Sequence, residues 1–266
     1  MIKQVIFFSF VFAFSVSNAQ TKSYKMVQKH QLKAEYCELD QLNNLYIVKK
    51  GEVLKLDADG VELNRFSDKR IGEAVLLDVS NPMKVLLYSP DQMMLYTLDS
   101  RLGELSERIN WFESGYEQIS LVATSHSNGM WLYDPINFVL IRLNEKLEEQ
   151  TRSLSLSQLF RQELNPTDLI EVNNKVYLTD PNHGVMEFDV FGNYLRKIPI
   201  KEIDRLVVND NRLFYSENQK LEAFNLYDGS IERVEIPIDE QETFAANRNR
   251  VLITRQGDVF IYQALR

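Results

Sequence analysis

The sequence has few cysteines for disulfides and few histidines for a metal site, and basic residues are fewer than acidic ones. Cys37 is the one cysteine in 266 residues, so no disulfide can form within the chain. The only histidines, His30, His126 and His183, lack the closely spaced pair of ligands typical of metal sites. A formal net charge of −8 disfavours nucleic acid and anionic membrane surfaces as partners. We therefore expect no metal, no other cofactor and no nucleic acid, and a domain held by its hydrophobic core, with Cys37 buried in it as a small apolar residue.

Long hydrophobic runs are also missing, apart from one at the N-terminus. Lys3 is followed by the run Val5–Phe14, which is apolar except for one serine, and then by Ser17 and Ala19 at the −3 and −1 positions of a signal-peptidase site. The run is shorter than the roughly 20 residues of a membrane-spanning helix, which disfavours a retained anchor. Gln20 stands where a lipoprotein has cysteine, so we expect no lipid anchor. The sequence predicts an exported protein, periplasmic or extracellular, in which residues 1–19 are removed and residues 20–266 form a single domain.

The rest of the chain repeats a unit of about forty residues, a length typical of repeat architectures. Each unit has a short first strand, a strongly apolar second strand, and a third strand that ends in Asp or Asn before a turn. Four antiparallel strands in such a length make one blade of a β-propeller. Six units fit, so we predict an all-β fold, a six-bladed β-propeller with four-stranded antiparallel blades. The second strands contain, at equivalent positions, Leu45, Val85, Met130, Val176, Leu213 and Val251.

The two ends of the chain predict how the ring closes. The sixth unit stops at Arg266, just after its third strand, and so lacks an outer strand. The segment Tyr24–Leu32 alternates loosely and precedes the first unit. We expect it to complete the last blade, which would remove an open sheet edge. One interval departs from the strand pattern: Ser157–Leu164 is predicted as a short helix, capped by Ser157 and ended by Asn165-Pro166.

Two of the units carry a family resemblance. In Tyr46–Gly60 and Tyr177–Gly192 a strand is followed by an apolar-x-apolar-Asp run and then by a glycine turn. These units resemble exported bacterial six-bladed propellers of the NHL and TolB type, over about the whole chain after the signal. The resemblance implies the fold and a bias toward protein or ligand binding, and it carries no functional residue over. Related gluconolactonase-like lactonases place acidic and Asn metal ligands around the central channel, and their ligand motifs are not matched here.

Carboxylates on the predicted innermost strands are the candidates for chemistry. A converging pair could act as acid and base, as hydrolases require. There is no Gly-x-Ser-x-Gly nucleophile and no glycine-rich phosphate loop. Turn formation accounts for Asp57–Gly60 and Asp180–His183, which superficially resemble metal-binding segments. The alternative function is a hydrolase or lactonase centred on the channel, or a channel that binds a glycan or small molecule. The channel carboxylates would then come from Glu38, Asp40, Asp78, Asp168, Glu171 and Asp204.

The better functional hint is the inter-blade segment Asn110–Tyr116, which places three aromatic residues in a loop. Aromatic residues are enriched in protein interfaces. In propellers such loops share one face with the loops between second and third strands. The other interpretation is that Trp111 or Phe112 fills the gap between adjacent blades. The leading hypothesis is a non-enzymatic interaction module, monomeric outside its complex, that binds an envelope or secreted protein through Trp111, Phe112, Tyr116, Tyr133, Asp134, Phe160 and Arg161.

Overall fold

A computed structural model describes residues 21–49, 51–72, 75–200, 202–203, 205–209, 211–239 and 242–265. The predicted signal at residues 1–19 and the candidate Asp204 lie outside these ranges. Within them, no helix has both the length and the apolar character that crossing a membrane requires.

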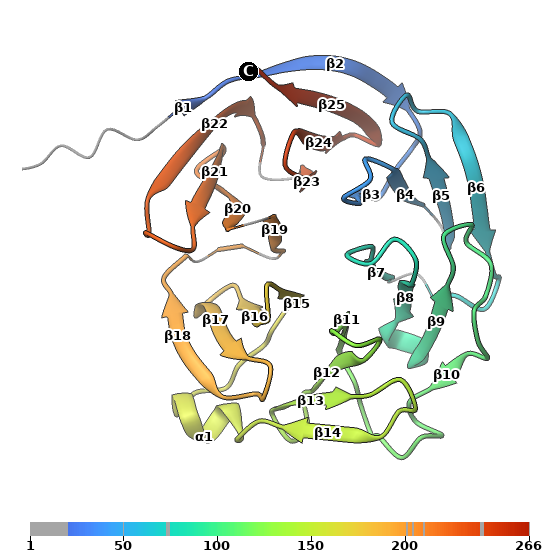
Figure 1. Cartoon of the computed structure of the whole chain (residues 1–266), viewed down its shortest axis with the longest axis vertical. Helices are drawn as coiled ribbons and strands as arrows, with labels where there is room; N and C mark the ends of the chain where they lie inside the picture. The colour runs from blue at the N-terminus through green and yellow to red at the C-terminus, as the bar shows by residue number, and fades with distance from the viewer. Residues whose placement is uncertain are drawn as a thin grey trace, which may run out of the picture.

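Six four-stranded antiparallel sheets form a closed ring, each with its first strand toward the centre (Figure 1). This confirms the predicted six-bladed β-propeller. Blade 1 contains β3 (Tyr36–Leu39), β4 (Leu45–Lys49), β5 (Glu52–Leu56) and β6 (Glu62–Ser67). Blade 2 contains β7 (Leu76–Asp78), β8 (Val85–Ser89), β9 (Met94–Leu98) and β10 (Ile109–Asn110), with a 3-10 turn η1 (Pro90–Gln92). Blade 3 contains β11 (Leu121–Thr124), β12 (Met130–Asp134), β13 (Val139–Leu143) and β14 (Glu149–Arg152).

The second half of the ring follows the same order. Blade 4 contains β15 (Asp168–Val172), β16 (Lys175–Asp180), β17 (Gly184–Asp189) and β18 (Tyr194–Ile198). Blade 5 contains β19 (Val207–Asn209), β20 (Arg212–Glu217), β21 (Lys220–Asn225) and β22 (Ile231–Pro237). Blade 6 contains β23 (Thr243–Ala246), β24 (Arg250–Arg255), β25 (Asp258–Ala264) and, from the other end of the chain, β2 (Tyr24–Gln31).

The N-terminal segment closes the ring as predicted. β2 pairs antiparallel with β25, in a register that runs from Tyr24 opposite Ala264 to Gln31 opposite Asp258. Just before it, β1 (Thr21–Lys22) adds in parallel to the outer edge of β22 in blade 5. The segment therefore lies along the rim of two blades (Figure 1).

In blades 1 to 5, an Asp or Asn at or just after the end of the third strand caps the turn that follows. Asp57 Oδ1 accepts hydrogen bonds from the backbone N–H groups of Asp59 and Val61, both at 2.9 Å. Side-chain acceptors at such positions stabilise turns directly. The segment Asp57–Gly60 is thus a hairpin turn, and Gly60 supplies its positive φ of 82°. The same two bonds, to the second and fourth residues onward, recur at Asp99, Asn144 and Asp189.

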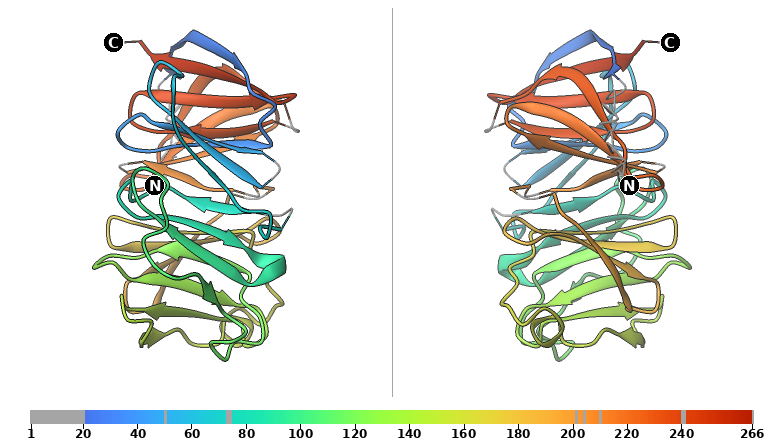
Figure 2. Two further views of the ribbon diagram at one scale, coloured as in Figure 1. Left: turned by 90° about the vertical axis from the view of Figure 1, so that its right-hand side faces the viewer. Right: turned by 90° about the vertical axis from the view of Figure 1, so that its left-hand side faces the viewer.

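Two of these turns also join neighbouring blades, because each accepts a hydrogen bond from the blade before it. Lys55 Nζ in blade 1 donates to Ser100 O at 2.8 Å, and Thr151 Oγ1 in blade 3 donates to Phe191 O at 2.8 Å. Each buried apolar cluster likewise draws its residues from two adjacent blades. The ring seen from the side has its strands between two faces, where the connecting loops lie (Figure 2).

The helical insertion between blades 3 and 4 is shorter and begins earlier than predicted. Helix α1 spans Leu156–Phe160, its N-cap is Ser155, and it ends at Arg161 in the left-handed conformation. The start shifts because Leu156 is fully buried against blades 3 and 4. The end shifts because Leu164 is buried in the same cluster, which requires the chain to leave the helix before it.

Candidate functional site

Four of the six candidate carboxylates meet on the central channel. Glu38, Asp78, Asp168 and Glu171 line one cavity of about 330 Å³, together with Arg205. Asp40 lies just past β3, buried in a turn, where its Oδ1 accepts the N–H groups of Leu42 and Asn44 at 2.8 Å each. The convergence that the sequence could only suggest is therefore present.

The channel carboxylates are occupied, however, by groups from neighbouring blades. Asp78 Oδ2 accepts the N–H of Thr124 in blade 3 at 2.6 Å, and Asp168 Oδ2 accepts the N–H of Leu206, just before β19 of blade 5, at 2.6 Å. These bonds join residues one repeat apart in sequence. These partly buried carboxylates accept backbone N–H groups and thereby link adjacent blades.

Glu171 is the most fully engaged of the four. Its Oε2 accepts Ser125 Oγ–H and Trp131 Nε1–H, both at 2.6 Å, and its Oε1 accepts the backbone N–H of His126 at 3.1 Å. Burial alone would raise the pKa of Glu171, but hydrogen bonds from Ser125, Trp131 and His126 lower it below its ordinary value. The ionised carboxylate can only accept, so the contact at 2.8 Å requires His126 Nδ1 to carry its proton. Glu171 in this way joins blade 4 to the first hairpin of blade 3.

Arg205, just before β19 of blade 5, reaches across the channel to blade 1. It forms an ion pair with Glu38, and its guanidinium lies over the Tyr36 ring at 4.6 Å from the centroid. Burial lowers the pKa of Arg205 and raises that of Tyr36 to about 12, so Tyr36 is neutral near pH 7. Nothing in the sequence marked this arginine, since it stands outside the strands and its partner is in another repeat.

Asp168 occupies a position in the channel where its ionised form is disfavoured. Burial and the charge of Asp78 raise its pKa to about 7, although N–H groups of Leu206 and Leu169 oppose the shift. It therefore exchanges a proton near neutral pH. A group of this kind can act as an acid or base if a substrate reaches it.

Metal chemistry has no support in the described ranges of the chain. No group of three or more His, Cys, Asp or Glu side chains is arranged there to hold a metal ion. Asp180 Oδ1 accepts the N–H groups of Asn182 and His183 at 2.9 and 3.0 Å, which is turn formation. Cys37 is buried and bonds Thr254 Oγ1 at 3.0 Å, and burial raises its pKa to about 11, so it is no nucleophile at neutral pH.

The second candidate site is the face that carries the inter-blade loops. Three of these loops, those that leave blades 2, 3 and 4, hydrogen-bond to the turn between the second and third strands of the blade they leave. Trp111 N donates to Met93 O at 3.0 Å, Leu156 N to Phe138 O at 2.8 Å, and Glu202 N to Pro181 O at 2.8 Å. Inter-blade loops and these turns therefore share one face, as the sequence predicts; we call it the loop face.

The predicted aromatic patch on this face divides into buried and exposed members. Trp111 is fully buried, packs edge-on against Tyr116 at 5.7 Å, and fills the space between blades 2 and 3. Tyr133 and Asp134 are also buried, because they end the second strand of blade 3. Trp111, Tyr133 and Asp134 therefore lie beneath the loop face and not on its surface. This corrects the predicted patch, which included all three as binding residues.

The surface of the loop face is formed by other members and by residues that the sequence did not single out. Phe112 is 70% exposed, whereas Phe160 is half-buried against Tyr194 and Arg161 is exposed. Further exposed apolar side chains lie on the turn of blade 3 and around α1, namely Ile136 (50%), Leu154 (77%) and Leu159 (41%). Clusters of exposed apolar residues mark interaction surfaces more often than scattered ones do.

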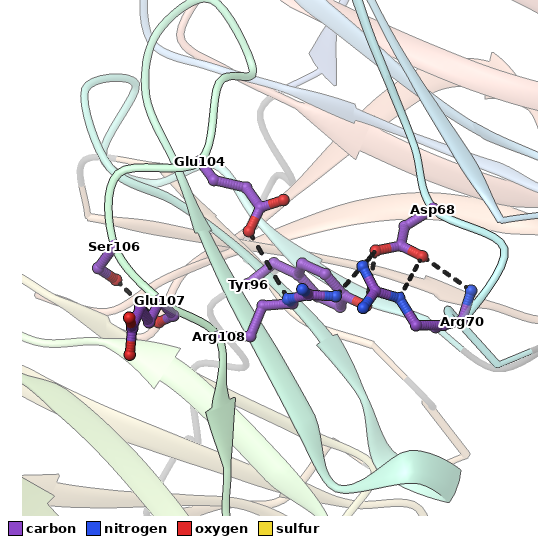
Figure 3. A network of polar contacts seen from close by, with 7 residues as sticks. All are labelled: Asp68, Arg70, Tyr96, Glu104, Ser106, Glu107 and Arg108. Carbon is purple, nitrogen blue, oxygen red and sulfur yellow. Dashed lines mark hydrogen bonds and ion pairs between the residues drawn. The ribbon is translucent and has the colours of Figure 1, made fainter.

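A charged network at the outer rim serves structure rather than binding. Asp68, after β6 of blade 1, accepts Arg70 Nη2 at 2.6 Å and Arg108 Nη1 of blade 2 at 3.2 Å (Figure 3). Arg108 also faces Glu104 at 3.7 Å, and its guanidinium lies 5.7 Å from the centroid of the Tyr96 ring. Hydrogen bonds from Arg70 hold the pKa of Asp68 at about 2. Two cations face two anions, so the network joins two blades and leaves no net charge for a ligand.

Comparisons with known proteins place the fold among β-propellers and go no further. No protein-family profile matches the chain, and neither does any curated protein sequence.

Virginiamycin B lyase from Staphylococcus aureus is similar in structure with a TM-score of 0.61, at 12% identity, over 91% of this chain and 100% of the lyase. The Pan2 WD40 domain of Neurospora crassa is similar with a TM-score of 0.60, at 10% identity, over 91% of this chain and 96% of that domain. A third neighbour, BBS1N in complex with ARL6DN, has a TM-score of 0.54 at 11% identity, over 84% of this chain and 75% of its own. Identities this low show a shared propeller fold alone.

Proposed function

We propose that the chain is an exported, non-enzymatic β-propeller that acts as a protein-interaction module in the cell envelope and binds through its loop face. The observation that carries the proposal is the exposed apolar set Phe112, Ile136, Leu154 and Leu159 on one face. The channel also favours this proposal, because most of its carboxylates are already engaged in hydrogen bonds between neighbouring blades. Among the structural neighbours, one was solved as a complex with another protein.

The test is recovery of partners from an envelope extract by tagged chains. A Phe112→Ser/Ile136→Ser chain is compared with wild type and with a Phe191→Ser/Tyr227→Ser control. The control removes two exposed aromatic residues from third-to-fourth-strand turns, outside the loop face. We expect the same protein to be recovered by wild type and control and lost from the loop-face variant, and then to bind the purified chain directly. Equal recovery by all three chains would refute the loop face as the binding surface.

A second candidate function is supported by one observation, the raised pKa of Asp168 in the channel cavity. A hydrolase or lactonase would use such a group as its acid or base. A screen of lactone and glycan substrates with wild type and Asp168→Asn tests it. Turnover that the variant lacks would establish this function, and no turnover by wild type would remove it.

A further inference from the structure

The exposed apolar set of the loop face lies across blade 3. Phe112 comes from the loop that enters this blade, and Ile136 lies in the turn between its second and third strands. Leu154 and Leu159 come from the loop that leaves it, and Leu156 N holds that loop to the turn through a backbone hydrogen bond of 2.8 Å. The four exposed side chains therefore belong to one surface centred on blade 3.

The segments that carry this set also carry charge of mostly one sign. They are residues 90–93, 111–120, 135–138 and 153–167, all of which the structure describes. Their exposed carboxylates are Asp91, Glu113, Glu117 and Glu163, whereas Arg161 is their only cation. Four carboxylates against one guanidinium leave an excess of three negative charges around the apolar set.

The fold does not use these four carboxylates. None of them forms an ion pair or accepts a side-chain hydrogen bond within the part of the chain that the structure describes. Acidic residues on the opposite face behave differently, since Asp57 and Asp189 each accept two backbone N–H groups of their own turn. The negative charge of the loop face is therefore not explained by turn formation or by contacts between blades.

We propose that the loop face of blades 2 to 4 binds a segment of a partner protein in which apolar side chains are flanked by lysine or arginine; this inference rests on the proposed function of that face. Apolar side chains of the segment would cover Phe112, Ile136 and their neighbours and remove them from water. Lysine and arginine suit the surroundings, because their aliphatic stems pack on apolar surface while their cationic heads reach carboxylates. A segment with acidic flanks would bring like charges together and be rejected.

Three synthetic peptides of equal length test the chemistry of this surface. The first combines leucine and lysine at helical spacing, the second has glutamate for each lysine, and the third has serine for each leucine. Fluorescence anisotropy of the labelled peptides measures their binding to the chain from residue 20 onward. We expect only the leucine–lysine peptide to bind, and its Kd to rise with salt because exposed charges are screened.

Two double variants locate the binding. Glu113→Gln/Glu117→Gln should raise the Kd of the leucine–lysine peptide about fivefold, because two attractive charges are lost. Glu107→Gln/Glu145→Gln is the matched control, since it removes two exposed carboxylates from third-to-fourth-strand connections and changes the net charge equally. The assignment is overturned if the leucine–lysine peptide does not bind, if the leucine–glutamate peptide binds as well, or if both double variants weaken binding to the same extent.

The two proposals fail separately. A chain that binds the leucine–lysine peptide through the loop face but recovers no protein refutes the interaction function. A partner that is lost from Phe112→Ser/Ile136→Ser, yet is recovered equally by Glu113→Gln/Glu117→Gln and at high salt, supports the interaction function and refutes the basic character of the partner.

Discussion

The channel wall and the loop face hold similar side chains in opposite states. In the channel, Asp78 accepts one hydrogen bond from its own blade and one from the neighbouring blade, and Glu171 accepts several from the neighbouring blade. On the loop face, Glu113 and Glu117 are exposed, and Phe112 projects into solvent. A carboxylate that accepts hydrogen bonds from a neighbouring blade stabilises the ring, whereas an exposed one adds little to stability. Burial and hydrogen bonding therefore distinguish the two sets better than residue type does.

Removal of the closing strand β2 is expected to have the largest effect on stability. A chain that begins at Leu32 lacks β2 and leaves the edge of β25 open. We expect the loss to be comparable with the roughly 5–15 kcal/mol that holds a typical domain together, so that cooperative unfolding disappears. A chain that begins at Ser23 removes only β1 and should melt close to wild type in a thermal scan followed by circular dichroism. An unchanged melting temperature for the shorter chain would show that β2 does not close the ring.

Two adjacent residues, Trp111 and Phe112, give the sharpest contrast between buried and exposed aromatic side chains. Trp111→Ala should lower the free energy of unfolding by about 3–5 kcal/mol, since it empties the space between blades 2 and 3. Phe112→Ser should change it by less than about 0.5 kcal/mol, since the ring is mostly exposed. Urea unfolding of both variants measures the difference. Similar losses of unfolding free energy for the two variants would contradict the assignment of Trp111 as buried and Phe112 as exposed.

Glu171 and Glu149 test the same contrast for carboxylates. Glu171→Gln should cost about 2 kcal/mol, because an amide N–H₂ group would face donors that the carboxylate now accepts. Glu149→Gln breaks an exposed ion pair with Arg152 and should cost less than about 1 kcal/mol. The measurement is again urea unfolding at neutral pH. A larger effect at Glu149 would contradict the view that the channel carboxylates are the structural ones.

A further test of the channel is a pH dependence of stability that originates at Asp168. Its pKa of about 7 in the fold lies above its ordinary value, so the folded state holds a proton that the unfolded state has released. Stability should therefore fall as pH rises from about 4 to 7. Asp168→Asn should remove this part of the slope, as measured by urea unfolding across that range. An identical slope of stability against pH in both chains would show that the pKa of Asp168 is not raised in the folded state.

The repeat pattern was sufficient to predict the six blades and the closing strand, because both follow from local strand periodicity and turn residues. Asp57, Asp99 and Asp189 cap their hairpins through bonds to residues two and four positions onward, which is information that a local sequence contains. The helix boundaries were wrong by a few residues because the burial of Leu156 and Leu164 is decided by neighbouring blades.

The candidate site was less predictable for the same reason. Asp78 and Glu171 find their partners about one repeat away, and Arg205 reaches across the ring to Glu38. Nor could the sequence tell which of two consecutive aromatic residues, Trp111 or Phe112, points inward. That choice depends on the path of a loop held by the bond from Trp111 N to Met93 O.

Partner recovery and thermal stability, measured in parallel on two double variants, distinguish most directly between binding at the loop face and binding in the channel. We predict that Asp78→Asn/Glu171→Gln lowers the melting temperature and, assayed below it, recovers the envelope partner as wild type does. We predict that Phe112→Ser/Ile136→Ser keeps the wild-type melting temperature and loses the partner. A channel variant that is stable but recovers nothing, beside a loop-face variant that recovers the partner normally, would contradict the account and place binding in the channel.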